Sequence, residues 1–293
     1  MNKIILFSLL LISNSLFSQN ISQNVIIEYE DTLCVIADII MNGETEEIRT
    51  EANIGFISEL KEVLKYPISY HHPFNKLISI SKLKSSDNSF RIFSWILKKE
   101  DGTYHYFNWV VLEAEKKDKE NTIIELKDNG NLINIENEIL NKDNWYGALI
   151  YKIISPKKKN NKHYTILSWD GSNPLFTTKT IDVITIKNKE VFLGKEIFIN
   201  GESSSKRVIY QYNTNSSASV NYEIEKKRII MDHLVPLKEN QEGFNQFYVS
   251  DGSYDCYQYK NGKWFFKEDI DARTKSTLPS IKKEKGSKGL FKN

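Results

Sequence analysis

Aspartates supply most of the side chains in this sequence that could do chemistry. Asp170 begins the segment Asp-Gly-Ser-Asn, and Asp251 begins Asp-Gly-Ser-Tyr-Asp, which ends at Asp255. Such a turn can offer a few oxygen ligands to Ca²⁺, which takes about six to eight. Aspartate also starts turns by accepting a hydrogen bond from the backbone two residues on. Because the EF-hand spacing is absent, we expect ordinary turns here and no metal site.

A second group of candidates lies in predicted strands. Asp182 stands between Ile181 and Val183 in an apolar stretch, and Asp232 is followed by His233 at the end of another strand. A buried carboxylate beside His or Arg can act as a general base with a shifted pKa, or form a structural ion pair. We expect Asp182 to be buried beside a cation, in a structural role.

The third group closes the β-rich part of the chain. Asp269, Asp271 and Arg273 alternate, which in a strand would place all three side chains on one face. With Trp264 or a tyrosine nearby, that face would suit a sugar hydroxyl, and it would also suit a solvated edge strand. The candidate ligand-binding or buried polar residues are therefore Asp170, Asp182, Asp232, His233, Asp251, Asp255, Asp271 and Arg273.

Several other chemistries lack their motifs. The 5 histidines show no His-Glu-x-x-His or comparable zinc spacing. There is no Gly-x-Ser-x-Gly elbow, phosphate loop or dinucleotide fingerprint, so no catalytic residue, cofactor or metal is predicted. The 40 Lys and Arg nearly balance the 38 Asp and Glu, which argues against a nucleic-acid partner. Cys34 and Cys256 could form a disulfide after export or remain buried free thiols.

Helical spacing precedes a long run of strands. Apolar residues recur every three or four positions through 21–66, with a break at Asn42-Gly43 and an end at Pro67, so a helical hairpin is expected there. From Leu77 onward, short β-branched and aromatic runs alternate with turn signals such as Asn261-Gly262. The expected strands are 77–83, 90–97, 104–114, 122–127, 148–154, 164–169, 180–187, 190–199, 207–212, 219–225, 228–232, 244–250, 255–260 and 263–268.

These elements predict a mainly β (α+β) fold, an antiparallel β-meander with an N-terminal helical hairpin. An open sheet of this size would curl or split, so a sandwich, a barrel or a propeller-like closure is expected. The similarity of Phe90–Trp95 to Tyr164–Trp169 favours the propeller, although hairpins resemble one another in general. The expected segments are a signal peptide (1–18), the hairpin packed on the body (19–67), a β-rich body (68–273) and a disordered basic tail (274–293).

Both ends of the chain carry their own signals. Met1-Asn2-Lys3, the apolar run 4–12 and the small residue Ser18 have the layout of a secretory signal peptide cleaved near Ser18. The run is too short for a membrane span, so a secreted or periplasmic protein is expected. The last 19 residues hold six Lys and one Glu, typical of a solubilising tail or of an arm for an anionic surface.

Several segments together resemble a known group of proteins. They are Trp145–Lys152, Tyr164–Gly171, Lys179–Ile184, Asp232–Leu234, Asp251–Asp255 and Asp269–Arg273, with a signal ending Leu-Phe-Ser-Gln. These are similar to an uncharacterised family of secreted, β-rich proteins from Bacteroidota-type Gram-negative bacteria. The resemblance implies export and a β-rich body, and it brings no known activity and no catalytic residues.

The sequence therefore favours an exported soluble protein that binds or scaffolds, with a glycan or a protein as the candidate partner. The alternative is a secreted hydrolase that uses a carboxylate pair among the candidate aspartates on polysaccharide or peptide. Glycoside hydrolysis needs two carboxyl groups roughly 5–10 Å apart. Such a pair in a cleft would indicate an enzyme, whereas scattered aspartates with satisfied turn hydrogen bonds would indicate binding.

Overall fold

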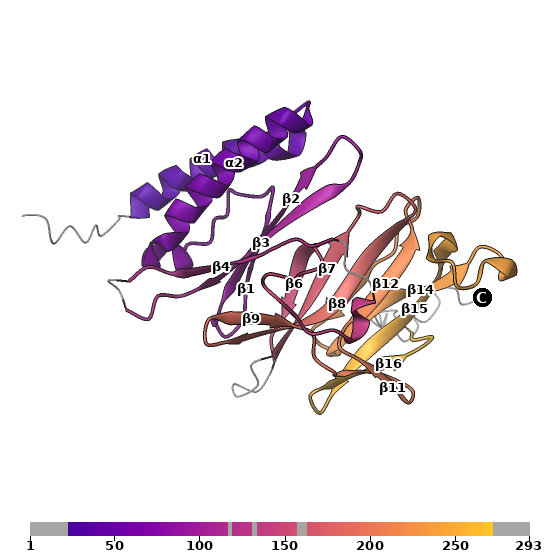
Figure 1. The fold of residues 1–293 in the computed structure, drawn as a ribbon. Coiled ribbons are helices and arrows are strands. Elements are labelled where there is room, and N and C mark those ends of the chain that lie inside the picture. Colours follow the sequence, from indigo (N-terminus) through magenta and orange to yellow (C-terminus); the bar gives the residue numbers. More distant parts are fainter. Residues whose placement is uncertain (1–22, 117–118, 131–133, 157–162, 272–293) are drawn as a thin grey trace, which may run out of the picture.

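The computed structural model describes residues 23–116, 119–130, 134–156 and 163–271. The predicted signal peptide and basic tail, and with them Arg273, lie outside these residues. Within the described part, two long helices are followed by strands that form three sheets stacked face to face (Figure 1). The mainly β fold with two N-terminal helices is confirmed, and of the predicted closures the structure has the sandwich.

The helical hairpin consists of α1 (Gln23–Asn42) and α2 (Glu46–Lys65). Thr45 caps α2, because its hydroxyl accepts a hydrogen bond from the amide of Ile48 at 3.2 Å. Glu46 and Glu47 in the first turn and Lys65 in the last complement the helix dipole. A single turn of 3-10 helix, η1 (Pro67–Tyr70), follows, since proline cannot continue the helix.

The inward face of each helix differs from the purely apolar stripe expected from the sequence. On α2, Arg49 and Asn53 are buried, whereas Ile48 is 43% exposed. Arg49 donates to the carbonyl of Lys98 at 3.0 Å, and Asn53 accepts from the indole of Trp95 at 2.8 Å. Polar side chains with specific partners thus replace apolar ones where the hairpin meets the first sheet.

The first sheet has the order β1-β2-β3-β4, and its strands are β1 (Ser81–Lys84), β2 (Arg91–Lys98), β3 (Tyr104–Leu112) and β4 (Thr122–Leu126). The second has the order β5-β9-β8-β7-β6, with β5 (Leu140–Asn141), β6 (Leu149–Ile154), β7 (His163–Asp170), β8 (Phe176–Lys187) and β9 (Glu190–Leu193). β12 (Val208–Asn213) pairs with the first half of β8.

The third sheet has the order β11-β10-β16-β15-β14-β13. Its strands are β10 (Phe198–Asn200), β11 (Ser203–Ser205), β13 (Val220–Glu223), β14 (Arg228–Pro236), β15 (Tyr248–Lys260) and β16 (Lys263–Lys267). All pairs in it are antiparallel except β10 with β16. Short 3-10 turns complete the described chain at η2 (Ile135–Asn137), η3 (Glu239–Gln241) and η4 (Asn245–Phe247).

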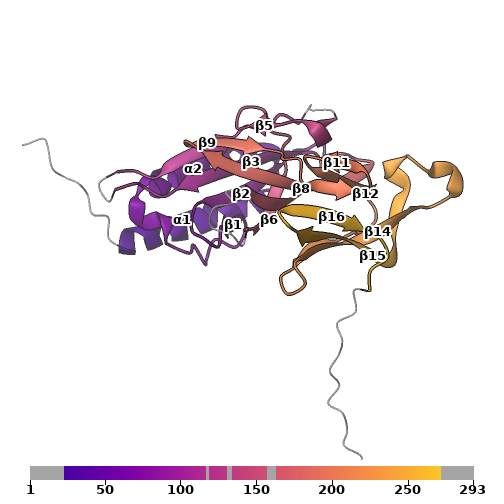
Figure 2. The same cartoon turned by 90° about the horizontal axis from the view of Figure 1, so that it is seen from below.

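Three apolar clusters join the layers. The first, with Phe56 and Trp95, lies between the helices and the first sheet. The second, with Val110, lies between the first and second sheets, and the third, with Trp264, lies between the second and third. Figures 1 and 2 show the hairpin and the β14–β16 part of the third sheet at opposite ends of this stack.

The second sheet is covered on both faces. Ile166 and Leu167 are neighbours on β7, and they belong to the second and third clusters respectively, because successive side chains of a strand point to opposite faces. Strand β7 is therefore buried continuously from Tyr164 to Ser168, with Thr165 and Ser168 as its buried polar side chains. Specific hydrogen bonds fix the stacking: the Ser94 hydroxyl accepts from the amide of Ile150 at 2.9 Å, and the Thr165 hydroxyl accepts from the indole of Trp264 at 3.0 Å.

Several of the expected strands have different bounds in the structure. The run 190–199 is two strands, because Gly194 takes a φ of +98° between β9 and β10. The runs 244–250 and 255–260 belong largely to the single strand β15, and β14 continues to Pro236 where an end at Asp232 was expected. A register shift between Asp232 and Leu234 lets both strands continue past the segment that was expected to be a turn.

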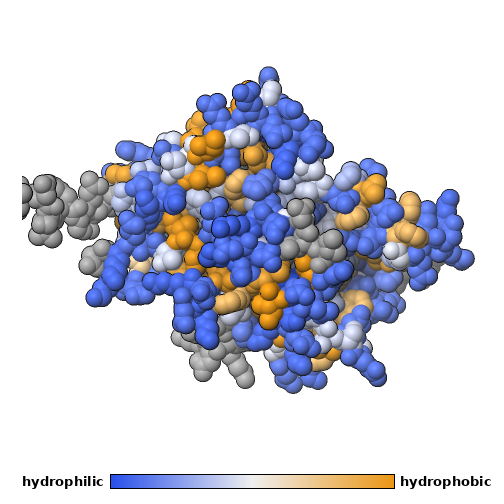
Figure 3. Space-filling view, viewed as in Figure 1, coloured by the Kyte–Doolittle hydropathy of each residue, from blue (hydrophilic) through white to orange (hydrophobic). Residues whose placement is uncertain are grey.

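The visible surface is mostly hydrophilic, with apolar residues in separate patches (Figure 3). None of the helices in the described part of the chain has the length and apolarity to cross a membrane. Cys34 on α1 and Cys256 on β15 are free thiols with no disulfide between them, and of the two only Cys256 is fully buried, whereas Cys34 is half buried.

Candidate functional site

Asp182 lies in the interior of the protein. It is on β8 with a fully buried side chain, and its Oδ2 lies 3.0 Å from Nε of Arg207, which is also fully buried. Its Oδ1 accepts a hydrogen bond from the amide of Val183 at 2.6 Å. Burial raises the pKa of Asp182, and the Arg207 guanidinium opposes that shift. The expected buried pairing with a cation is confirmed.

Arg207 joins Asp182 to the segment around η2. It donates through Nη1 to the carbonyls of Ile135 and Glu138, the latter at 3.0 Å. Gly194 gives the guanidinium room, since a Cβ there would lie 2.8 Å from Nη2 and 2.6 Å from the Glu138 carbonyl oxygen. The Asp182–Arg207 pair therefore connects β8 with η2 and with the start of β12. Because the Asp182 carboxylate is fully buried, it has no access to a ligand.

Asp170 borders a polar groove, here called the Asp170 groove, lined by Tyr104, Tyr106, Asp128, Tyr146, Gly147, Asp170 and Ser172. Oδ1 of Asp170 accepts from the Tyr106 hydroxyl at 2.6 Å and from the Ser172 amide at 2.9 Å. Burial and the Asp170 carboxylate raise the pKa of Tyr106. The hydrogen bond from the Ser172 amide, two residues on from Asp170, forms the turn that was predicted from the sequence.

Asp128 is a second carboxylate at the Asp170 groove, and the sequence analysis did not single it out. Its Oδ2 accepts from the amide of Tyr106 at 2.9 Å and lies 3.2 Å from Nδ1 of His105. The backbone of Gly147 passes so close that a Cβ there would lie 2.2 Å from Oδ1 of Asp128. Nothing in the local sequence Lys-Asp-Asn-Gly distinguishes this aspartate from a turn former, so only the fold reveals it.

Asp255 and His233 meet across β14 and β15. Oδ2 of Asp255 lies 2.9 Å from Nδ1 of His233, and Oδ1 accepts from the amide of Asp269 at 3.1 Å. The hydrogen bond to Asp255 raises the pKa of His233, with Asp251 and Glu268 adding to the shift. The pair closes the β-bulge between the two strands and connects it to the end of the described chain.

The remaining candidates have local roles. Asp232 accepts from the amide of Ser219 at 2.7 Å, and exposed Asp251 accepts from the amide of Ser253 at 2.9 Å. The backbone carbonyl of exposed Asp271 accepts from Arg228 at 3.5 Å. The described residues 269–271 do not form the expected strand, since Asp269 has a φ of +47°. Among the described residues, no group of three or more His, Cys, Asp or Glu is placed to hold a metal ion.

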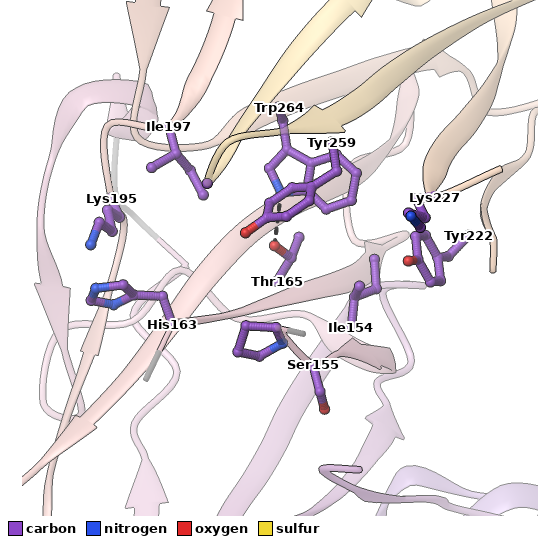
Figure 4. Close-up of a pocket in the computed structure, with 12 residues that line it drawn as sticks. Ile154, Ser155, His163, Thr165, Lys195, Ile197, Tyr222, Lys227, Tyr259 and Trp264 are labelled. Atoms are coloured by element: carbon purple, nitrogen blue, oxygen red, sulfur yellow. Dashed lines mark hydrogen bonds between the residues drawn. The ribbon is translucent and has the colours of Figure 1, made fainter. Parts of the chain in front are cut away.

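A different site lies between the second and third sheets, here called the Trp264 pocket. It is a cavity of about 220 Å³, and the residues that define it are Ile154, His163, Thr165, Lys195, Tyr222, Lys227, Tyr259 and Trp264 (Figure 4). Ile154 and His163 stand at facing ends of β6 and β7, and the aromatic residues come from β13, β15 and β16. Of these residues, only Trp264 was expected from the sequence to suit a sugar.

A hairpin turn positions the aromatic side chains. Asn261 and Gly262 have φ values of +51° and +85°, as a type I′ turn requires, so Tyr259 and Trp264 become directly opposite cross-strand partners. Their ring centroids lie 4.9 Å apart, and the ring of Tyr222 stands almost perpendicular to that of Trp264. Thr165 fixes the indole of Trp264 through its hydrogen bond. The result is a rigid aromatic wall with Tyr259 and Tyr222 only half buried.

The opposite side of the Trp264 pocket is polar. Nδ1 of His163 contacts the Thr185 hydroxyl at 2.8 Å, which leaves Nε2 to face a ligand. Burial and the nearby Lys195 ammonium lower the pKa of His163, so its imidazole is neutral at neutral pH. Burial lowers the pKa of Lys195 as well. The pocket therefore combines apolar ring faces with donors on the opposite wall, the usual composition of a small-molecule site.

Comparisons with known proteins found no family model, no curated protein and no solved structure that matches this chain. The function must therefore be inferred from the geometry of the molecule itself.

Proposed function

We propose that this chain is an exported protein that binds a glycan in the Trp264 pocket without cleaving it. Export rests on the signal-peptide layout of residues 1–18 and on the resemblance to secreted proteins of Bacteroidota-type bacteria. The observation that carries the binding role is the pocket itself, where Tyr259, Tyr222 and Trp264 form a wall opposite His163.

A sugar ring fits this chemistry. Its C–H faces are apolar and pack on aromatic rings, while its hydroxyls need hydrogen-bonding partners at the edge. Tyr259 and Tyr222 supply both, because each has an apolar ring and a hydroxyl. The cavity of about 220 Å³ is smaller than the roughly 300–1,000 Å³ of sites for drug-sized ligands, so it suits a single ring at the end of a chain.

The scattered aspartates also support binding over hydrolysis. Asp182 is sealed in the interior with Arg207, and Asp232 and Asp251 each accept a local backbone hydrogen bond. None of the predicted carboxylates lines the Trp264 pocket among the described residues.

Glycan-array binding by the full secreted chain tests the proposal. The variant Tyr259→Ala removes a half-buried aromatic face and keeps the buried Trp264 side chain. We expect it to lower affinity for the bound glycan by about tenfold or more. Tyr254→Ala, at a half-buried tyrosine on the same strand but outside the pocket, is the matched control. Equal loss in both variants, or no glycan bound by the parent chain, would contradict the proposal.

One observation favours the second candidate, a hydrolase acting on polysaccharide or peptide. Asp128 and Asp170 border the same Asp170 groove, and Tyr106 hydrogen-bonds to both. If this pair were catalytic, the parent chain would release reducing ends from a polysaccharide or new amino termini from a protein, and Asp170→Asn would abolish that release. We expect no release above background from either kind of polymer.

A further inference from the structure

The charged residues at the Trp264 pocket all have one sign. Lys195 and Lys227 line it from two different loops, together with neutral His163, and no Asp or Glu is present among the described residues of its wall. Figure 4 shows the two lysines on opposite sides of the Tyr259 and Trp264 rings. In the described part of the chain, neither lysine has an acidic partner within ion-pair distance. The pocket is therefore a small cationic space lined by aromatic rings.

Lys195 is the more informative of the two lysines. It is half buried, and burial lowers its pKa, which means that removal from water penalises its charged form. An anion that replaces the water excluded by burial stabilises the charged form of an ammonium group in this position. Lys195 lies beside His163 and opposite the aromatic wall, so the anion that stabilises its charge is a group on a ligand inside the pocket.

We propose that the ring bound in the Trp264 pocket is an acidic sugar, a pyranose that bears a carboxylate or a sulfate group. The inference rests on the proposed function and adds the ligand class: the sugar face packs on the half-buried ring of Tyr259, and its anionic group pairs with Lys195 or Lys227. Since the cavity holds about 220 Å³, the acidic ring is a single residue, such as the end of an acidic polysaccharide chain.

Isothermal titration of the full secreted chain with sodium D-glucuronate and with D-glucose tests the charge, because the two sugars differ only in the group at C6. We expect glucuronate to bind at least about tenfold more tightly at low salt, which corresponds to about 1.4 kcal/mol. Added NaCl should weaken glucuronate binding and leave glucose binding unchanged, because salt screens the ion pair.

Two variants test whether the preference for glucuronate over glucose depends on the pocket lysines. In the double variant Lys195→Gln, Lys227→Gln, we expect the preference for glucuronate over glucose to fall below about threefold. Lys238→Gln, at an exposed lysine outside the pocket, should keep the full preference. A preference that survives the double variant would overturn the assignment to these lysines.

Further probes distinguish a sulfate from a carboxylate, and they distinguish failure of the acidic-sugar inference from failure of the glycan-binding function. N-acetylglucosamine 6-sulfate against N-acetylglucosamine measures a sulfate in place of the carboxylate, and inorganic sulfate alone measures an ion site without a sugar. Inorganic sulfate that binds as tightly as the sulfated sugar would overturn the proposal. If neutral and acidic sugars bind equally in the pocket, the acidic-sugar inference fails and the glycan-binding function stands. If no sugar binds there, both fail.

Discussion

The Asp182 carboxylate and the Arg207 guanidinium lie 3.0 Å apart with both side chains fully buried, at the junction of β8 with the segment that leads into β12. Each charged group stabilises the other, because an unpaired charge in the interior of a protein lowers the free energy of unfolding. The pair therefore fixes how the second sheet meets the η2 segment, close to the Asp170 groove.

Asp182→Ala should lower the free energy of unfolding by about 3–5 kcal/mol, because it strands the Arg207 charge. Asp182→Asn keeps an acceptor oxygen and should lose less. Chemical denaturation of both variants beside the parent gives these values. Asp31→Ala is the control, since Asp31 forms an exposed pair with Lys76 that is worth about 0–1 kcal/mol. A change within about 0.5 kcal/mol for Asp182→Ala would mean that the pair contributes nothing.

A second buried pair ties the hairpin to the chain that follows it. Oε2 of Glu30 lies 2.6 Å from Nε2 of His72, and Oε1 accepts from the amide of Lys76 at 2.6 Å. Glu30→Ala should cost about 2 kcal/mol or more, since it leaves both donors unpaired, and should speed amide exchange in α1. Hydrogen exchange measures this, with exposed Glu28→Ala as the control. Unchanged protection of α1 in Glu30→Ala would show that the pair does not hold the helix.

The His233–Asp255 pair predicts a pH dependence of stability. The pKa of His233 is raised in the folded protein by its hydrogen bond to Asp255, so its contribution is complete below the unfolded pKa of about 6.5 and is lost as the pH rises through the folded pKa. The melting temperature of His233→Gln should therefore fall further below that of the parent at pH 5.5 than at pH 8.5. A difference independent of pH would mean that the imidazolium form gains nothing from Asp255.

Deletion of residues 275–293 should leave the fold unchanged, because the segment is rich in Lys and has no apolar periodicity. Thermal melting of the truncated and full chains measures this. A melting temperature lowered by more than about 4 °C, on the order of 1 kcal/mol for a protein of this size, would indicate that the tail docks on the body.

The helices and most strands could be predicted from local sequence, because their signals are local. The period of three to four residues ends at Pro67, and Asn261-Gly262 marks a true hairpin turn. The errors occur where partners distant in the chain decide the outcome. Arg49 turns inward to the Lys98 carbonyl and Asn53 to the Trp95 indole, because the first sheet meets that part of α2. Strand β15 continues through Asp251 because β14 accommodates the bulge.

The site was harder to predict for the same reason. Asp182 could be recognised as buried from its apolar neighbours, but its partner Arg207 carries no local signal. The Trp264 pocket assembles residues between 154 and 264 from two sheets, and only the aromatic content near Trp264 pointed toward it. A cavity between stacked sheets depends on how the sheets pack, and no short motif encodes that.

The sharpest measurement is whether a sugar bound in the Trp264 pocket perturbs the buried indole of Trp264, whose ring centroid lies 4.9 Å from that of Tyr259. The indole N–H signals of the 5 tryptophans can be followed by NMR, with that of Trp264 assigned from Trp264→Phe, while glucose, galactose, mannose, N-acetylglucosamine, glucuronate and galacturonate are each added to the full chain. We predict that at least one sugar shifts the Trp264 signal in a saturable way and leaves those of the other four tryptophans in place. If no sugar moves the Trp264 signal, or if every tryptophan signal moves together, the Trp264 pocket is not a glycan site.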